Sequence, residues 1–261
     1  PFRKWMQDTN PNNSIGTPLR QALDIVGQSY TLTSNSGPWG NTPWSPGSES
    51  SSSQVSCRRN FAILTTDGQW NNGGTTAQGI SITNSSNDSD GTNGSLITHQ
   101  NSTPTAPITY RYLAHDGADA RNVGRADKTS GTGYNNTLAD VAHYYWSRDL
   151  RTNLVNNVTD GKPTSPPFWQ NMTTYSIAFG VNGSYTQAQI DSAKAGTLNW
   201  PPPVANTATA FDDLVHTAHN GGGEFLAVND SADFSYALRK ILLSITGETS
   251  SQAGVAASTT A

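Results

Sequence analysis

The chain has 261 residues, of which 34% are hydrophobic and 13% are charged, and its formal net charge is −4 at pH 7. This charge-poor, slightly acidic composition excludes a protein that mainly binds nucleic acid, which needs a basic face, and a disordered acidic segment, which needs high net charge. No apolar run approaches the roughly 20 residues that cross a bilayer, and the single Cys57 excludes an internal disulfide framework or a cysteine-based zinc site.

The first predicted helix covers about residues 17–30. Thr17 is a suitable N-cap, and Pro18 fits the first helical position, where its missing N–H costs nothing. Apolar residues at helical spacing form one stripe: Leu19, Ala22, Leu23, Val26 and Tyr30. The sequence therefore predicts a helix that buries this stripe.

The next regular element is a strand between two long insertions. Residues 61–66 form a continuous apolar run that Asp67-Gly68 ends, which is typical of a strand buried on both faces of a parallel sheet. The segments 34–56 and 70–134 are rich in Gly, Ser, Asn and Thr and lack a clear period, apart from a brief possible strand at 108–113. We expect both to be surface insertions.

The second half alternates between helix and strand. A helix is predicted at 137–150, with Thr137 and Asp140 at capping-box spacing. A strand at 172–181, a helix at 211–220, a strand at 224–228 and a last helix that Ser231 caps follow. The apolar stripe of the last helix contains Phe234, Ala237, Leu238, Ile241, Leu242 and Ile245. This alternation predicts an α/β fold with an open sheet.

Three strong strands are fewer than such a sheet normally contains. We therefore expect a partial domain at 1–247, with further strands upstream of Pro1, and a linker at 248–261 toward a following domain. A piece of a longer polypeptide is the simplest interpretation, because the chain starts without a Met.

Two oxygen-bearing residues lie where open α/β sheets bind ligands, at strand carboxyl ends and helix N-termini. Asp67 ends the first buried strand and Thr17 begins the first helix, and such hard ligands suit Mg²⁺, Mn²⁺ or Ca²⁺. On local grounds alone, a simple helix cap and an Asp-Gly turn explain Thr17 and Asp67 better.

Several segments resemble one family in its order. Residues 16–23 (GTPLRQAL) and 63–68 (ILTTDG) are similar to segments of a von Willebrand factor A domain. More narrowly, the chain resembles the PilC/PilY family of type IV pilus tip adhesins and assembly proteins in four blocks: 57–71 (CRRNFAILTTDGQWN), 136–142 (NTLADVA) with Tyr144-Tyr145, 172–175 (MTTY) with 179–181 (FGV), and 212–214 (DDL) with 220–223 (NGGG).

The resemblance implies a metal-ion-dependent adhesion site, built from an Asp-x-Ser-x-Ser loop, a Thr and an Asp. Thr17 and Asp67 match the last two, with Mg²⁺ or Ca²⁺ as the cation. The Asp-x-Ser-x-Ser element is absent here, so we expect the remaining ligands upstream of Pro1 and weak or no occupancy in the isolated chain.

The function that the resemblance implies is adhesion and pilus assembly rather than catalysis. Its expected partners are minor pilins or pilus tip proteins, a host or abiotic surface, and the remainder of its own polypeptide, with no nucleic acid. Its expected location is extracellular, at the pilus tip on the bacterial surface, or associated with the outer membrane. The alternative is a metal-independent structural module that docks on minor pilins and primes assembly.

Catalysis is not expected, because no Gly-x-Ser-x-Gly elbow or phosphate-binding glycine motif follows a strand. Asp212 and Asp213 are interpreted as complementing the dipole at a helix start. A hydrolase on the same α/β frame therefore remains a remote third hypothesis.

Other chemistry-bearing residues have ordinary interpretations. His216 and His219 form a packed or solvated pair rather than a metal site, and residues 87–91 (NDSDG) form a flexible turn rather than a calcium loop. Trp39 and Trp44 anchor their insertion. Cys57 either pairs with a cysteine outside the chain or is a buried free thiol.

Overall fold

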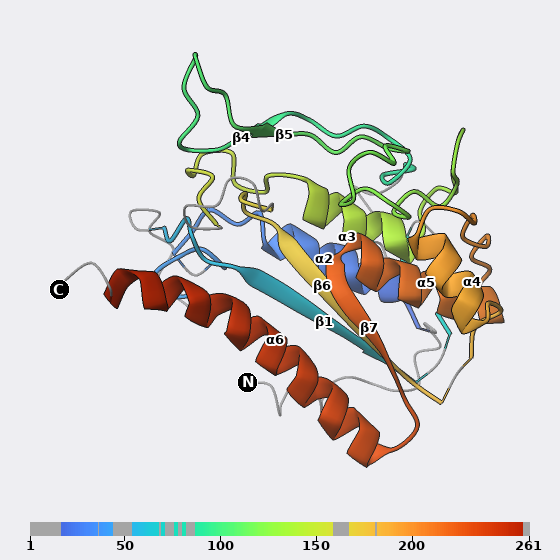
Figure 1. Cartoon of the computed structure of the whole chain (residues 1–261). Helices are drawn as coiled ribbons and strands as arrows, with labels where there is room; N and C mark the ends of the chain where they lie inside the picture. Colours follow the sequence, from blue (N-terminus) through green and yellow to red (C-terminus); the bar gives the residue numbers. More distant parts are fainter. Residues whose placement is uncertain are drawn as a thin grey trace.

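The centre of the molecule is a sheet of three parallel strands, seen in a computed structural model that describes residues 17–35, 37–43, 54–67, 69–70, 76–77, 80–81, 87–158, 167–180 and 182–257. The strands are β1 (Asn60–Thr66), β6 (Met172–Phe179) and β7 (Gly222–Val228), in the order β1-β6-β7 (Figure 1). Helices flank this sheet. The predicted α/β class is confirmed, and the arrangement is consistent with a von Willebrand A-like, Rossmann-type fold.

Helices cover both faces of the sheet, and Figure 1 shows α6 on the side opposite α2, α3 and α5. Helices α2, α3 and α5 contribute Leu23, Leu138 and Leu214 to one apolar core, whereas α6 contributes Ala237 and Ile241 to a second. The helices in the described part of the chain are α2 (Leu19–Ser29), α3 (Leu138–Ser147), α4 (Gln187–Lys194), α5 (Ala208–Asn220) and α6 (Ser231–Ala257).

The central strand β6 faces both cores. Met172 and Ala178 belong to the core under α2, α3 and α5, while Tyr175 and Ile177 belong to the core under α6. This division follows from the two-residue period of a strand. By contrast, the prediction that the 61–66 strand is buried on both faces is wrong, because β1 lies at the edge of the described sheet and Ile63 is exposed.

The helix predicted at 17–30 begins at Leu19, with Pro18 as its N-cap. Its buried face also differs from the prediction, since Ala22 and Val26 are exposed. The physical reason is its contact with α3: a Cβ at Gly27 would overlap the ring of Tyr145, so the missing side chain lets that ring approach. Tyr145 also donates a hydrogen bond to Asp24 Oδ1 at 2.7 Å, which turns a polar face inward.

The second half follows the predicted alternation. The capping box of α3 is confirmed, since Thr137 and Asp140 exchange side chain to backbone hydrogen bonds. At the last helix, Asp230 takes the predicted capping role of Ser231 and accepts hydrogen bonds from the backbone N–H groups of residues 232 and 233, both at 2.8 Å.

Two helices depart from the predicted boundaries. Helix α4 was not predicted, and it buries Ile190 and Ala193 against the first core. Helix α6 continues to Ala257, well into the 248–261 segment expected as a linker. No helix in the described part of the chain has the length and apolar character needed to cross a membrane.

The described residues of the insertion at 70–134 contain little regular structure. Its two-residue strands are β2 (Thr76–Ala77), β3 (Ile80–Ser81), β4 (Ile97–Thr98) and β5 (Thr109–Tyr110), and β5 lies within the predicted brief strand. Tyr110 and Tyr112 pack with Phe168 and Trp169 in a separate aromatic cluster. Tyr110 stacks on Trp169 with ring centroids 4.7 Å apart. Aromatic packing therefore joins this insertion to the chain just before β6.

The insertion at 34–56 has an aromatic anchor, as predicted. Trp39 is fully buried, and its Nε1 donates to the carbonyl of Arg58 at 3.1 Å. Its ring lies edge-on to Tyr30 at the end of α2. Trp44 lies outside the described residues.

Candidate metal centre

The two residues predicted as metal ligands lie next to different elements. Asp67 follows β1 directly and is exposed, and Thr17 is partly buried just before α2. The carbonyl of Thr17 accepts a hydrogen bond from the N–H of Leu19 at 2.9 Å. Among the described residues, Asp67 is not part of any group of three His, Cys, Asp or Glu side chains that could share one ion. A cation bound by Thr17 and Asp67 therefore stays a prediction.

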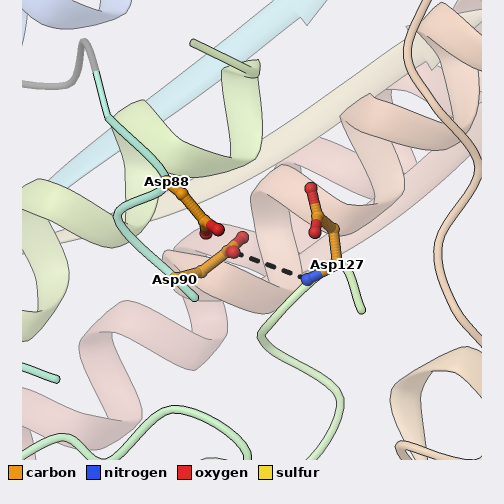
Figure 2. A group of neighbouring side chains, drawn as sticks. All are labelled: Asp88, Asp90 and Asp127. Atoms are coloured by element: carbon orange, nitrogen blue, oxygen red, sulfur yellow. Dashed lines mark hydrogen bonds between the residues drawn. The ribbon is translucent and has the colours of Figure 1, made fainter. Parts of the chain in front are cut away.

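A cluster of three aspartate side chains that could hold a metal ion lies in the insertion 70–134. Asp88, Asp90 and Asp127 each offer one oxygen, and these oxygens lie within 4.8 Å of one another. The residues are only 7%, 0% and 2% exposed. Figure 2 shows the Asp88 and Asp90 side chains coming from one loop, with Asp127 reaching the same place from a second segment.

The backbone around Asp88 packs closely against its carboxylate. Oδ1 accepts a hydrogen bond from the N–H of Gly91 at 2.6 Å, and Oδ2 accepts one from the N–H of Gly133. A Cβ at Gly91 would overlap the Asp88 carboxylate. A Cβ at Gly133 would overlap Asp127 Oδ1 and lie 2.8 Å from Asp88 Oδ2. Glycine is needed at both positions, because only a residue without a side chain allows these approaches.

Asp90 connects the loop to the C-terminal end of α5. Its Oδ2 accepts a hydrogen bond from Asn220 Nδ2 at 2.7 Å, and its Oδ1 accepts one from the N–H of Asp127 at 3.4 Å. The carbonyl of Asp90 accepts a hydrogen bond from the hydroxyl of Tyr112 at 2.5 Å. These contacts place the Asp90 carboxylate in a fully buried position.

Asp127 has one satisfied carboxylate oxygen and one unsatisfied oxygen. Oδ2 accepts a hydrogen bond from the N–H of Tyr134 at 2.8 Å. Oδ1 is buried and accepts no hydrogen bond. Buried carboxylate oxygens normally accept a hydrogen bond. Because Asp127 Oδ1 accepts none, it is available as a ligand for a metal ion.

Among the described residues, the cationic side chains of Arg125 and Lys128 act on Asp90 and Asp127, but only from beyond ion-pair distance. Within the described part of the chain, no Lys or Arg forms an ion pair with any of them, and the nearest basic group is His216 Nε2, 3.7 Å from Asp90 Oδ2. Burial, followed by the nearby carboxylates of Asp140, Asp127 and Asp88, raises the pKa of Asp90 well above its usual value. Burial also raises the pKa of Asp127 to about 7. Asp90 and Asp127 therefore resist carrying a negative charge unless a proton or a cation neutralises it.

Two further aspartates tie neighbouring elements together. Asp140 Oδ1 accepts the N–H of Ser89 at 2.7 Å, which joins the first turn of α3 to the 87–91 loop. Asp213 accepts the N–H groups of Leu138 at 3.0 Å and Ala139 at 3.2 Å, both in that same turn. Asp213 therefore supports the dipole of α3 rather than that of its own helix, which corrects the prediction.

Asp212, the residue before Asp213, has a different role. Its carboxylate accepts hydrogen bonds from the N–H and hydroxyl of Ser184 and from the N–H of Tyr185. Helix α5 begins at Ala208, before both acidic residues, so neither lies in its first turn. Asp212 thus fixes the loop that leads into α4.

The interpretation of residues 87–91 as a flexible turn is wrong. Asp88 and Asp90 are buried, and the loop between them is bonded to α3. The Asp-x-Asp-Gly pattern was a usable signal, because it places two carboxylates before a tight glycine turn. Asp127 carries no such signal, because it joins the group only through folding.

The packed interpretation of the two histidines is confirmed. His216 Nε2 bonds to the carbonyl of Arg125, and its ring stacks on Trp200 with centroids 4.3 Å apart. His219 Nε2 lies 3.0 Å from the carbonyl oxygen of Val123. Cys57 is exposed, so the hypothesis of a buried free thiol is wrong.

Comparison with known proteins finds relatives of this chain among type IV pilus proteins. In an alignment of 271 positions that covers 95% of the chain, it is 29% identical to the type IV pilus biogenesis factor PilY1 of Pseudomonas aeruginosa strain PAK. In an alignment of 286 positions, which also covers 95% of the chain, it is 27% identical to PilY1 of strain PAO1. The predicted resemblance to the PilC/PilY family is borne out by these PilY1 relatives, at 26–29% identity.

The chain spans only 20% of the length of these PilC/PilY relatives. The similarity therefore concerns one part of a much longer protein. No family model matches the chain. No solved structure matches it either.

Proposed function

We propose that this chain is a module of a type IV pilus protein that acts in adhesion and pilus assembly rather than in catalysis. The observation that carries the proposal is the similarity to PilY1, which extends over 95% of the chain. Because that similarity includes both the sheet and the insertions, the module is expected to share the relatives' role in pilus biogenesis. Its proposed location is extracellular, at the pilus tip or associated with the outer membrane.

The proposed adhesion mechanism uses a divalent cation, Mg²⁺ or Ca²⁺, near Thr17 and Asp67. Asp67 is exposed at the carboxyl end of β1, which is where open α/β sheets bind ligands. A bound cation would supply an open coordination position that an acidic group of a partner completes. Thr17 and Asp67 would hold the cation together with ligands from outside these two residues, and binding would be reversible by chelation.

Minor pilins, pilus tip proteins, and host or abiotic surfaces are the proposed partners. The insertions 34–56 and 70–134 are suited to select among them, because loops on a rigid scaffold carry most recognition. Exposed residues such as Leu96, Arg111 and Arg121 lie in the second insertion.

The alternative function is a structural module that docks on minor pilins without a metal. One observation favours it: Asp67 belongs to no group of three potential ligands among the described residues. Under this alternative, the exposed surface of the module would bind pilins equally well with and without divalent cations.

The test is Asp67→Ala in the full-length protein, with Asp116→Ala as a matched control in the insertion. If adhesion uses the proposed cation, Asp67→Ala lowers surface attachment about as much as a chelator does, whereas pilus number stays unchanged. Unchanged attachment together with pilin binding in chelator supports the structural alternative. If removal of residues 1–247 affects neither attachment nor pilus number, both functions are wrong.

A further inference from the structure

We propose that Asp88, Asp90 and Asp127 bind one divalent cation of the Ca²⁺ type, at a site separate from Thr17 and Asp67. This cation would fasten the 87–91 loop to the 125–134 segment over α3 and α5. The proposal does not depend on the proposed function in adhesion, because it concerns the internal order of the insertion.

The spacing of the three carboxylates suits Ca²⁺. Their ligand atoms lie within 4.8 Å of one another. Ca²⁺ binds oxygen at roughly 2.3–2.6 Å, so two ligands on opposite sides of it are about 4.6–5.2 Å apart. Mg²⁺ binds at about 2.1 Å and retains several waters, which suits an enclosed group of protein oxygens less well. The carboxylates can therefore accept the larger ion with little movement.

A second observation, independent of the number of acids, is the unsatisfied oxygen of Asp127. Asp127 is only 2% exposed, and its Oδ1 is buried and accepts no hydrogen bond. It lies beside Asp88 Oδ2, since a Cβ at Gly133 would meet both oxygens. Figure 2 shows the Asp127 carboxylate turned toward the space that the Asp88 and Asp90 carboxylates also face. A bound cation would satisfy this oxygen.

The local charge balance also favours a cation. Three buried carboxylates lie close together, and no Lys or Arg of the described residues lies within ion-pair distance of them, since Arg125 and Lys128 act on Asp90 and Asp127 only from farther away. Asn220 donates to Asp90 through Nδ2, while its own Oδ1 is buried without a hydrogen-bond donor. A neutral amide donor does not balance the charge of the carboxylates.

The competing hypothesis is that protons alone neutralise the group. Burial raises the pKa of Asp127 to about 7, so a protonated carboxyl would also relieve the repulsion. The two hypotheses differ in their response to metal. A proton-neutralised group gains no stability from Ca²⁺, whereas a cation site gains stability in proportion to the logarithm of the Ca²⁺ concentration.

The experiment uses the 261-residue chain, freed of metal with a chelator and titrated with Ca²⁺ or Tb³⁺ alone. Tb³⁺ luminescence sensitised by tryptophan reports binding directly, because the Trp200 ring stacks on His216, whose Nε2 lies 3.7 Å from Asp90 Oδ2. Thermal unfolding reports the gain in stability. At a Ca²⁺ concentration about 100-fold above its Kd, we expect the Tm of the wild type to rise by roughly 5 °C or more.

Asp127→Asn is the decisive variant. Its amide oxygen can still accept the N–H of Tyr134, while its NH₂ group can donate to Asp88 Oδ2. We expect Ca²⁺ affinity to fall on the order of 100-fold, because one charged ligand is lost. In chelator, the variant should be at least as heat-stable as the wild type, because the uncompensated charge is smaller. That result also shows that the variant folds.

Two matched variants complete the test. Asp116→Asn changes an aspartate in the same insertion that only accepts a local backbone N–H, and it should bind Ca²⁺ like the wild type. Asp67→Asn should also retain binding. The proposal is wrong if the wild type shows neither bound Tb³⁺ nor a Ca²⁺-dependent rise in Tm, or if Asp127→Asn binds as tightly as the wild type. Loss of binding in Asp67→Asn alone would assign the ion to the adhesion-type site instead.

Discussion

The sheet with its helices and the insertion segment 87–134 are held together by different interactions. In the first region, buried apolar residues such as Leu138, Ile177 and Leu214 fill two continuous cores. In the second, the longest strands have two residues, and buried aspartates and tyrosines supply many of the contacts. A segment without apolar periodicity can thus be ordered when its polar groups find buried partners. It depends on those partners being brought together by the rest of the fold.

The largest expected effect lies in the apolar region. Leu214→Ala removes a fully buried side chain of α5 and leaves a cavity, which should lower the free energy of unfolding by about 2–5 kcal/mol. Leu96→Ala, in the insertion, changes a side chain that is 64% exposed and should cost less than about 0.5 kcal/mol. Urea unfolding measures both. Equal costs would show that the two regions do not differ in this way.

The second prediction concerns how Asp213, which lies where the two regions meet, makes the stability of the fold depend on pH. Burial raises its pKa to about 6 in the folded state, whereas an unfolded aspartate titrates near about 3.9. The folded state therefore holds this proton more tightly, and the contribution of Asp213 to stability falls as pH rises from about 4 to about 6.

The corresponding experiment compares the wild type with Asp213→Asn, which cannot titrate. Across this pH range, the stability of the wild type relative to the variant should fall by up to about 3 kcal/mol. Urea unfolding of both proteins, measured in steps of about one pH unit from about pH 4.5 to about pH 6.5, gives the difference in their free energies of unfolding. A difference that is independent of pH, or that grows as pH rises, would contradict the prediction.

The smallest expected loss of stability comes from removing a helix cap, and two caps with the same local pattern can be compared. Thr137 and Thr186 both form capping boxes, but Thr137 is 3% exposed and its partner Asp140 also binds Ser89 of the insertion. We expect Thr137→Ala to cost about 1–2 kcal/mol and Thr186→Ala about 0.5–1 kcal/mol. Hydrogen exchange at Ser89 should speed up in the first variant alone. If it speeds up in both, the link between cap and insertion is not specific.

Prediction from sequence succeeded where one segment contains its own signal. The three strong strands, the α3 capping box and the anchoring role of Trp39 each follow from neighbouring residues. It failed where a distant partner decides. The apolar stripe of α2 was misassigned at Val26, because the contact between Gly27 and the Tyr145 ring turns a different face inward.

By itself, the sequence determined the α/β alternation, the family resemblance and the position of Asp67 at the end of a strand. These follow from local periodicity, turn residues and short motifs. Only the tertiary structure decided that Asp88, Asp90 and Asp127 form one buried group and that Asp213 supports a helix other than its own. The physical reason is that a carboxylate's role depends on the donors and charges around it in space, and folding draws those from distant parts of the chain.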